Sequence, residues 1–204
     1  MKKAILFLVL QFVTISGFSQ NARDFINQGR YKYDLKNYSG AIDDFTKAIS
    51  LDSNSDSAYY YRAIAKELLG DNEGSIADYT KSIAIGKMYS RASYVYQARG
   101  VLKQIAGDYR GSIVDFTTAI SLGSGVNPEN YQARGTSKGM MKDYVGAIAD
   151  FTMVISYAPT NEAYYGRGVA NLALQKKNIA CLDFSKAGEL GNKEAYEYIR
   201  KYCH

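Results

Sequence analysis

The stretch GSIVDFTTAI, residues 111–120, decides the fold, because four similar segments stand at regular distances along the chain. They are GAIDDFTKAI from Gly40, GSIADYTKSI from Gly74, GAIADFTMVI from Gly146 and IACLDFSKAG from Ile179. The spacings between successive copies are 34, 37, 35 and 33 residues. A period of this length predicts a row of stacked structural repeats in place of one globule around a single core.

A second pattern precedes each copy, with an aromatic residue four positions before a glycine or alanine. It appears as FINQG ending at Gly29, YYYRA at Ala63, YQARG at Gly100 and Gly135, and YYGRG at Gly168. Together the two patterns resemble the tetratricopeptide repeat (TPR), a helix–turn–helix unit of about 34 residues. The resemblance covers residues 22–190, nearly the whole chain. The departures are few: Ala63 replaces the small glycine, Val154 replaces a small residue, and the closing proline survives only at Pro159.

The resemblance implies an all-α protein, a right-handed TPR superhelix of five helix–turn–helix repeats closed by a C-terminal capping helix. Within a repeat domain at 20–191, the expected units span about 22–55, 56–92, 93–127, 128–160 and 161–191, and the cap spans 192–204. Each repeat leaves an apolar face that only its neighbour covers. We expect the first-helix Gly100 to let the second helix approach, with Ser112 providing the facing gap and Phe116 filling what remains.

The N-terminal residues are typical of a secretion signal. Lys2 and Lys3 precede a mostly apolar run from Ala4 to Ile15, and small residues follow at Gly17 and Ser19. We therefore expect a signal peptide at 1–19, cleaved after Ser19. A retained anchor is the alternative, but a run of about 12 residues is shorter than the ~20 that span a bilayer.

Composition and motifs argue against catalysis. The only histidine is the terminal His204, which removes most histidine-dependent nucleophilic chemistry. The sequence shows no phosphate-binding glycine motif and no zinc spacing, so we expect no enzyme, no cofactor and no metal. Removal of Lys2 and Lys3 lowers the formal net charge from +5 to +3, and charges alternate in sign, so we expect no nucleic-acid partner. After cleavage we expect no membrane insertion.

A recurring pair of opposite charges links the two helices of a repeat. Arginine precedes the small first-helix residue, and aspartate follows 16 residues later. The pairs are Arg62 and Asp78, Arg99 and Asp115, Arg134 and Asp150, and Arg167 and Asp183. Repetition in every unit favours a scaffold contact over a ligand site, worth about 0–1 kcal/mol if partly exposed. Gln28 breaks the series, so Asp44 is expected to lack this partner.

Cys181 and Cys203 are the only cysteines. Cys181 is expected on the last second-helix face that meets the cap, and Cys203 lies on the cap. In an oxidising compartment such a pair permits a disulfide, and two separate buried thiols are the alternative.

The family's geometry places the first helices along the concave face of the superhelix. Their inward positions carry tyrosine, glutamine and aliphatic residues, a mixture that suits an extended peptide or a partner helix. These positions are Ile26, Arg30, Tyr33, Tyr60, Ile64, Glu67, Gln97, Val101, Gln104, Gln132, Thr136, Met140, Tyr165, Val169 and Leu172. A merely solvated inner wall is the alternative.

These features predict an exported scaffold or adaptor that binds a protein or peptide partner in its concave groove. The expected compartment is the periplasm, with secretion as the alternative. A structural subunit of a cell-envelope complex, docked by its convex face or its cap, is a second hypothesis. A cell-wall-processing factor is a third. Partner identity and oligomeric state do not follow from the sequence, since a fold does not fix a function.

Overall fold

The computed structural model describes residues 21–87 and 90–203, which form eleven α-helices and no strand. The predicted signal peptide at 1–19 lies outside these residues. The helices are α2 (Ala22–Asp34), α3 (Tyr38–Leu51), α4 (Asp56–Leu68), α5 (Asn72–Ile85), α6 (Ala92–Ile105), α7 (Tyr109–Leu122), α8 (Pro128–Met140), α9 (Tyr144–Tyr157), α10 (Asn161–Ala173), α11 (Lys177–Glu189) and α12 (Lys193–Tyr202).

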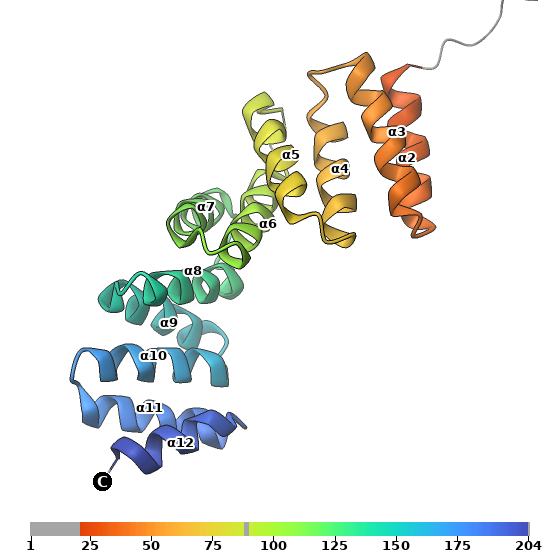
Figure 1. Ribbon diagram of the computed structural model, residues 1–204. Helices are drawn as coiled ribbons and strands as arrows, with labels where there is room; N and C mark the ends of the chain where they lie inside the picture. The colour runs from red at the N-terminus through yellow and green to blue at the C-terminus, as the bar shows by residue number, and fades with distance from the viewer. Residues whose placement is uncertain (1–20, 88–89, 204) are drawn as a thin grey trace, which may run out of the picture.

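Successive helices pair into antiparallel hairpins, α2 with α3 through α10 with α11, and the hairpins stack in chain order (Figure 1). Figure 1 shows a curved array whose first and last helices lie at opposite ends of the molecule. The all-α solenoid expected from the repeats is confirmed. No helix in the described ranges is both long enough and apolar enough to cross a membrane.

Helix capping explains the glycine that opens the repeated motif. The side chain of Asp108 accepts a hydrogen bond from the backbone N–H of Gly111 at 2.9 Å, and a Cβ on Gly111 would collide with that carboxylate. Asn37, Asp71 and Asp143 cap α3, α5 and α9 in the same way. This contact satisfies one of the free N–H groups at the start of a second helix.

The second-helix aromatic packs directly on the small first-helix residue. A Cβ on Gly100 would lie 3.1 Å from Cε1 of Phe116, and Phe116 is fully buried. Gly29, Gly135 and Gly168 face Phe45, Phe151 and Phe184 in the same manner. The expected packing is therefore present in these four hairpins, where a Cβ on the glycine would crowd the aromatic ring, and in the second hairpin Ala63 is buried in one cluster with Tyr79.

The arginine–aspartate pairs form, and each arginine also reaches the preceding repeat. Arg99 donates to both carboxylate oxygens of Asp115 at 2.9 and 2.6 Å, and it donates to Thr80 Oγ1 of the previous second helix at 3.0 Å. Its guanidinium also lies 5.6 Å from the ring centroid of Tyr96. Equivalent bonds join Arg62 to Asp78 and Thr46, Arg134 to Asp150 and Thr117, and Arg167 to Asp183 and Thr152.

Burial raises the cost of breaking this contact above the 0–1 kcal/mol expected for exposed pairs. The Asp115 side chain is 0% exposed, and Lys103 adds a second cation at 2.9 Å. Removing one partner of a buried pair leaves an uncompensated charge, which costs about 3–5 kcal/mol. In the first repeat Asp44 lacks the arginine, as expected, but it has a partner in Lys32 at 2.6 Å. Lysine four residues after the arginine position is thus a second recurring cation, which the sequence analysis missed.

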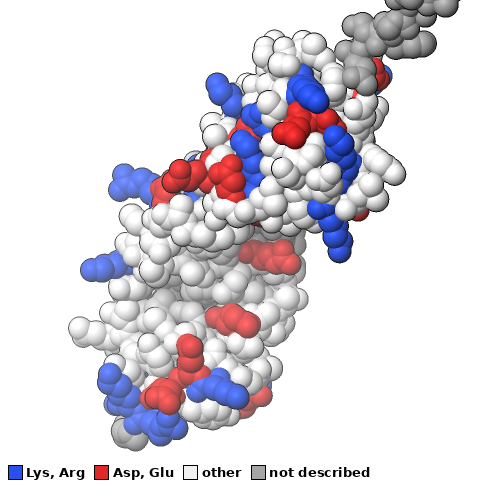
Figure 2. Space-filling view, turned by 45° about the vertical axis from the view of Figure 1, so that its right-hand side comes forward, with Lys and Arg blue, Asp and Glu red and all other residues white. Residues whose placement is uncertain are grey.

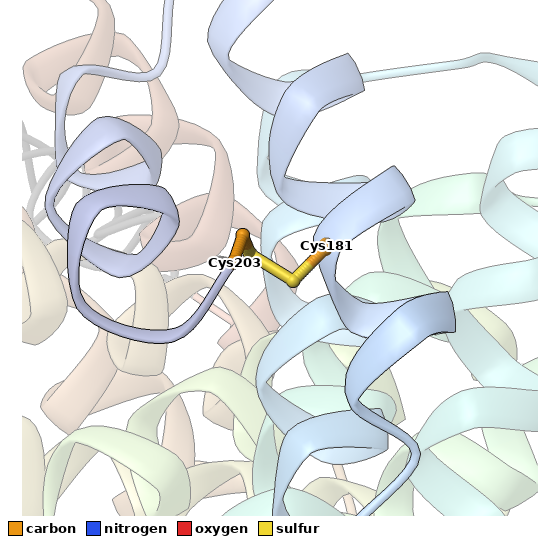
Figure 3. The surroundings of a disulfide bond; sticks show 2 residues. All are labelled: Cys181 and Cys203. Carbon is orange, nitrogen blue, oxygen red and sulfur yellow. A yellow bond between two sulfur atoms is a disulfide. The ribbon is translucent and has the colours of Figure 1, made fainter.

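Helix α12 covers the last hairpin. Ala195 is fully buried, and the Tyr198 ring lies 4.9 Å from Phe184 and 5.5 Å from Tyr165, measured between ring centroids. A disulfide joins Cys181 of α11 to Cys203 just after α12, with 5.7 Å between their Cα atoms (Figure 3). The two cysteines that the sequence placed on facing helices are therefore bonded in this structure.

Candidate functional site

A groove of about 820 Å³ lies between the first helices of the fourth and fifth hairpins and the start of the cap. Helices α8 and α10 form its walls, α9 contributes to its floor, and the first turn of α12 closes one end. Its lining residues are Gln132, Gly135, Thr136, Gly139, Met140, Tyr144, Ala147, Phe151, Asn161, Glu162, Tyr165, Gly166, Val169, Ala170, Asn192, Lys193 and Glu194.

Five of the predicted groove positions line this cavity together. They are Gln132, Thr136, Met140, Tyr165 and Val169. Thr136 and Met140 are exposed, whereas Tyr165 and Val169 are half-buried against the last core cluster. In the structure, predicted residues of two different repeats therefore line one groove.

Five of the other predicted positions line a smaller hollow or pack against the core. Ile26 and Arg30 line a hollow of about 530 Å³ between α2, the start of α4 and Arg91. Ile64, Tyr33 and Leu172 are half-buried and pack against core clusters.

Tyr60 differs most from the expectation of an accessible groove residue. It is only 8% exposed, because its ring packs against Tyr61, Tyr79 and Tyr94 and beneath the guanidinium of Arg91. Tyr60 therefore belongs to the core and offers little surface to a partner.

The remaining predicted positions form polar contacts within the solenoid or stay exposed. Gln104 donates to the Ala133 carbonyl at 3.0 Å and to Ser137 Oγ at 2.9 Å, so it joins two repeats. Glu67 accepts from the Tyr79 hydroxyl at 3.2 Å, and Gln97 donates to Glu129 at 3.5 Å. Val101 stays exposed outside both hollows.

Two solved structures share the architecture over almost the whole chain. The crystal structure of YrrB, described as a TPR protein with an unusual peptide-binding site, aligns with a TM-score of 0.83 at 17% identity over 92% of this chain and 95% of its own. The crystal structure of MamA aligns with a TM-score of 0.74 at 21% identity over 89% and 94%. The chain has the tetratricopeptide-repeat fold.

A third TPR structure matches part of this solenoid. The first TPR domain of Spaghetti (RPAP3), solved with the HSP90 peptide SRMEEVD, aligns with a TM-score of 0.53 at 26% identity over 56% of this chain and 92% of its own. No family model matches the sequence, and no curated protein matches it significantly.

Two glycines that the sequence did not single out line this TPR groove and play different parts. A Cβ on Gly139 would meet nothing within 4 Å, so the wall is open there. Gly166 packs directly on Phe151, since a Cβ there would lie 2.6 Å from the ring, and it leaves no free space. The available signal was a glycine in a first helix away from the packing position, where the other repeats carry larger residues.

The groove has an apolar interior and an acidic rim. Burial raises the pKa of Tyr165 in the groove wall, and hydrogen bonds with Tyr198 and Glu194 raise it further. Its hydroxyl therefore stays protonated at physiological pH and acts as a hydrogen-bond donor. In the described part of the chain, no three His, Cys, Asp or Glu side chains cluster as metal ligands would. The arrangement is suited to holding a ligand by burial and hydrogen bonds.

Proposed function

We propose that this TPR solenoid is an exported, non-catalytic scaffold that holds a peptide segment of a protein partner on its first-helix face. The observation that carries the proposal is the groove of about 820 Å³, which five predicted binding residues from two repeats line together. Cavities of roughly 300–1,000 Å³ suit compact ligands and anchor side chains. The peptide-binding site named for YrrB and the HSP90 peptide bound by the RPAP3 domain agree with this use of the fold.

Export is part of the proposal. The lysine-led apolar segment before Ser19 supports it, and so does the Cys181–Cys203 disulfide, since such bonds persist in oxidising compartments. We expect the mature chain to begin at Gln20 and to reside in the periplasm. Mass spectrometry of the protein purified from its native host tests this, and an intact N-terminus still carrying Lys2 and Lys3 would contradict cleavage.

A second candidate function is docking by the outer surface into an envelope complex. Exposed apolar side chains on second helices favour it, namely Val114 of α7, Val145 of α9 and Leu182 of α11, which are 59%, 69% and 73% exposed. Apolar residues on an exposed surface mark interaction sites only where they are contiguous.

Site-specific photocrosslinking in the native envelope separates the two functions. A photoreactive residue replaces Thr136 in the groove or, as the matched control, Val114 on an outer face. Both positions are exposed, so labelling efficiency is comparable. We expect a discrete crosslinked protein from position 136 and none from position 114. Crosslinks from position 114 alone would contradict binding in the groove and support docking by the outer face.

A further inference from the structure

The apolar lining and the rim charges of the groove between α8, α10 and α12 indicate the chemistry of its ligand. This inference rests on the proposed function. We propose that it binds a peptide segment in which a large apolar side chain stands beside a lysine or arginine. The apolar side chain enters the space left open beside Gly139, and the cation pairs with Glu162 and Glu194 at the rim.

The interior selects a large apolar group. The space beside Gly139 is unoccupied to 4 Å from where its Cβ would stand. Met140, Val169 and Phe151 line the same groove, and burial of apolar surface against them contributes roughly 25 cal/mol per Å². A methionine wall also adapts to ligands of different shape.

The rim selects a cation. Glu162 stands in the first turn of α10 and Glu194 in the first turn of α12, and neither forms an ion pair among the described residues. Lys193 also lines the rim, which leaves a net charge of −1. In Figure 2 the middle of the molecule presents a broad uncharged surface on which acidic side chains stand singly, whereas basic and acidic side chains gather together at the lower end. Rim charges of this kind steer a complementary partner and fix its register.

The smaller hollow at the other end of the inner face has the opposite charge. Arg23, Arg30 and Arg91 line it with a single carboxylate, Asp52. Arg30 and Arg91 both lie over the Tyr61 ring, at 5.2 and 5.7 Å from its centroid. Because like charges repel, a basic segment is excluded there and directed to the C-terminal groove.

Selection from a library of random 12-residue peptides displayed on phage tests the proposal. The baits are the wild-type protein and Gly139→Leu, which fills the groove, with Thr136→Phe as an independent blocking variant. Ala173→Leu is the control, because it adds the same side chain to the exposed end of α10 outside the groove. Thermal unfolding by circular dichroism establishes that each bait is folded.

We expect wild-type and Ala173→Leu baits to enrich peptides with a Leu, Met, Phe or Trp beside Lys or Arg. A synthetic peptide of that type should bind Gly139→Leu and Thr136→Phe at least about tenfold more weakly. The double variant Glu162→Gln/Glu194→Gln should lose the salt dependence of binding, whereas Glu73→Gln, at the same first-turn position of α5, should retain it.

The outcomes distinguish the chemistry assigned to the ligand from peptide binding itself. Selected peptides that are acidic, or that bind Gly139→Leu as tightly as wild type, overturn the assigned ligand chemistry and leave peptide binding by the solenoid in place. A wild-type bait that enriches no sequence overturns the proposed function as well.

Discussion

The inner face of the solenoid is more filled at its N-terminal end, with a hollow of about 530 Å³, than at its C-terminal end, with a groove of about 820 Å³, although both ends follow the same repeat. These are called the filled end and the open end below. In the second repeat Tyr61 stacks on Phe45 of the preceding hairpin, with 5.8 Å between ring centroids. In the fifth repeat Gly166 occupies the equivalent position, where its backbone packs directly on Phe151, and the open space lies beside Gly139. The difference teaches that the repeat frame fixes the fold, while single residues outside the packing positions decide where a ligand fits.

The largest expected effect comes from the cap that closes the open end. The variant Cys203→Ser removes a crosslink spanning 22 residues, for which loop-closure entropy predicts a loss of about 3 kcal/mol in the free energy of unfolding. Amide hydrogen exchange should show faster exchange in α12 and the neighbouring groove wall, with α2 to α5 unchanged. Uniform exchange along the chain would show that the cap does not stabilise this end locally.

The filled end can be opened by Tyr61→Ala. This change removes the stack on Phe45 and the cation–π contacts with Arg30 and Arg91, so we expect a loss of about 2–3 kcal/mol measured by urea unfolding. Tyr31→Ala on the exposed surface of α2 is the control and should cost less than about 0.5 kcal/mol. Equal losses for the two variants would contradict the packing role of Tyr61.

The tyrosine cluster at the filled end also predicts a pH dependence. Burial, reinforced by neighbouring Tyr94 and opposed by Arg91, raises the pKa of Tyr60 to about 12. An unfolded tyrosine ionises near pH 10, so between pH 10 and 12 the unfolded state binds fewer protons than the folded state. The free energy of unfolding should fall as pH rises in this window, by up to about 1.4 kcal/mol per unit. Tyr60→Phe should show a smaller slope in urea unfolding at pH 10 and 11.5, and an unchanged slope would refute the assignment.

The smallest expected effect on stability comes from filling the open end. Gly139 lies in α8 with no neighbour at its Cβ position, so Gly139→Leu should raise the free energy of unfolding by up to about 1 kcal/mol through helix propensity. Chemical denaturation of this variant beside Ala173→Leu measures the gain. A loss above about 1 kcal/mol would show that the site is already packed.

The fold could be predicted from the sequence because each packing position recurs in five repeats, and recurrence separates these positions from variable ones. Glycine and aromatic residues recur at positions where two helices must touch. The contact between Gly100 and Phe116 could therefore be predicted from the repeat pattern. The Arg99–Asp115 pair was predicted in the same way. Its bond to Thr80 was not, because that contact crosses between repeats and depends on how one hairpin sits on the next.

The candidate site was only partly predictable for the same reason. Three of the predicted inward positions of α8 and α10, namely Thr136, Met140 and Tyr165, line one groove in the structure, and their role in binding stays a prediction. Burial of Tyr60 was not visible, since it results from three tyrosines and Arg91 meeting in space. The opening at Gly139 was missed, although its place away from the packing glycine of α8 was the available signal, because the sequence alone does not show that no neighbouring side chain fills the space.

The central claim is that a partner segment occupies the groove between α8, α10 and the start of α12. Amide and methyl NMR of isotopically labelled protein, titrated with a peptide recovered by selection, tests it most directly. The account predicts shifts at Thr136, Gly139, Val169 and the first turn of α12, which disappear in Gly139→Leu. Shifts confined to the outer faces, around Val114 and Leu182, would contradict it.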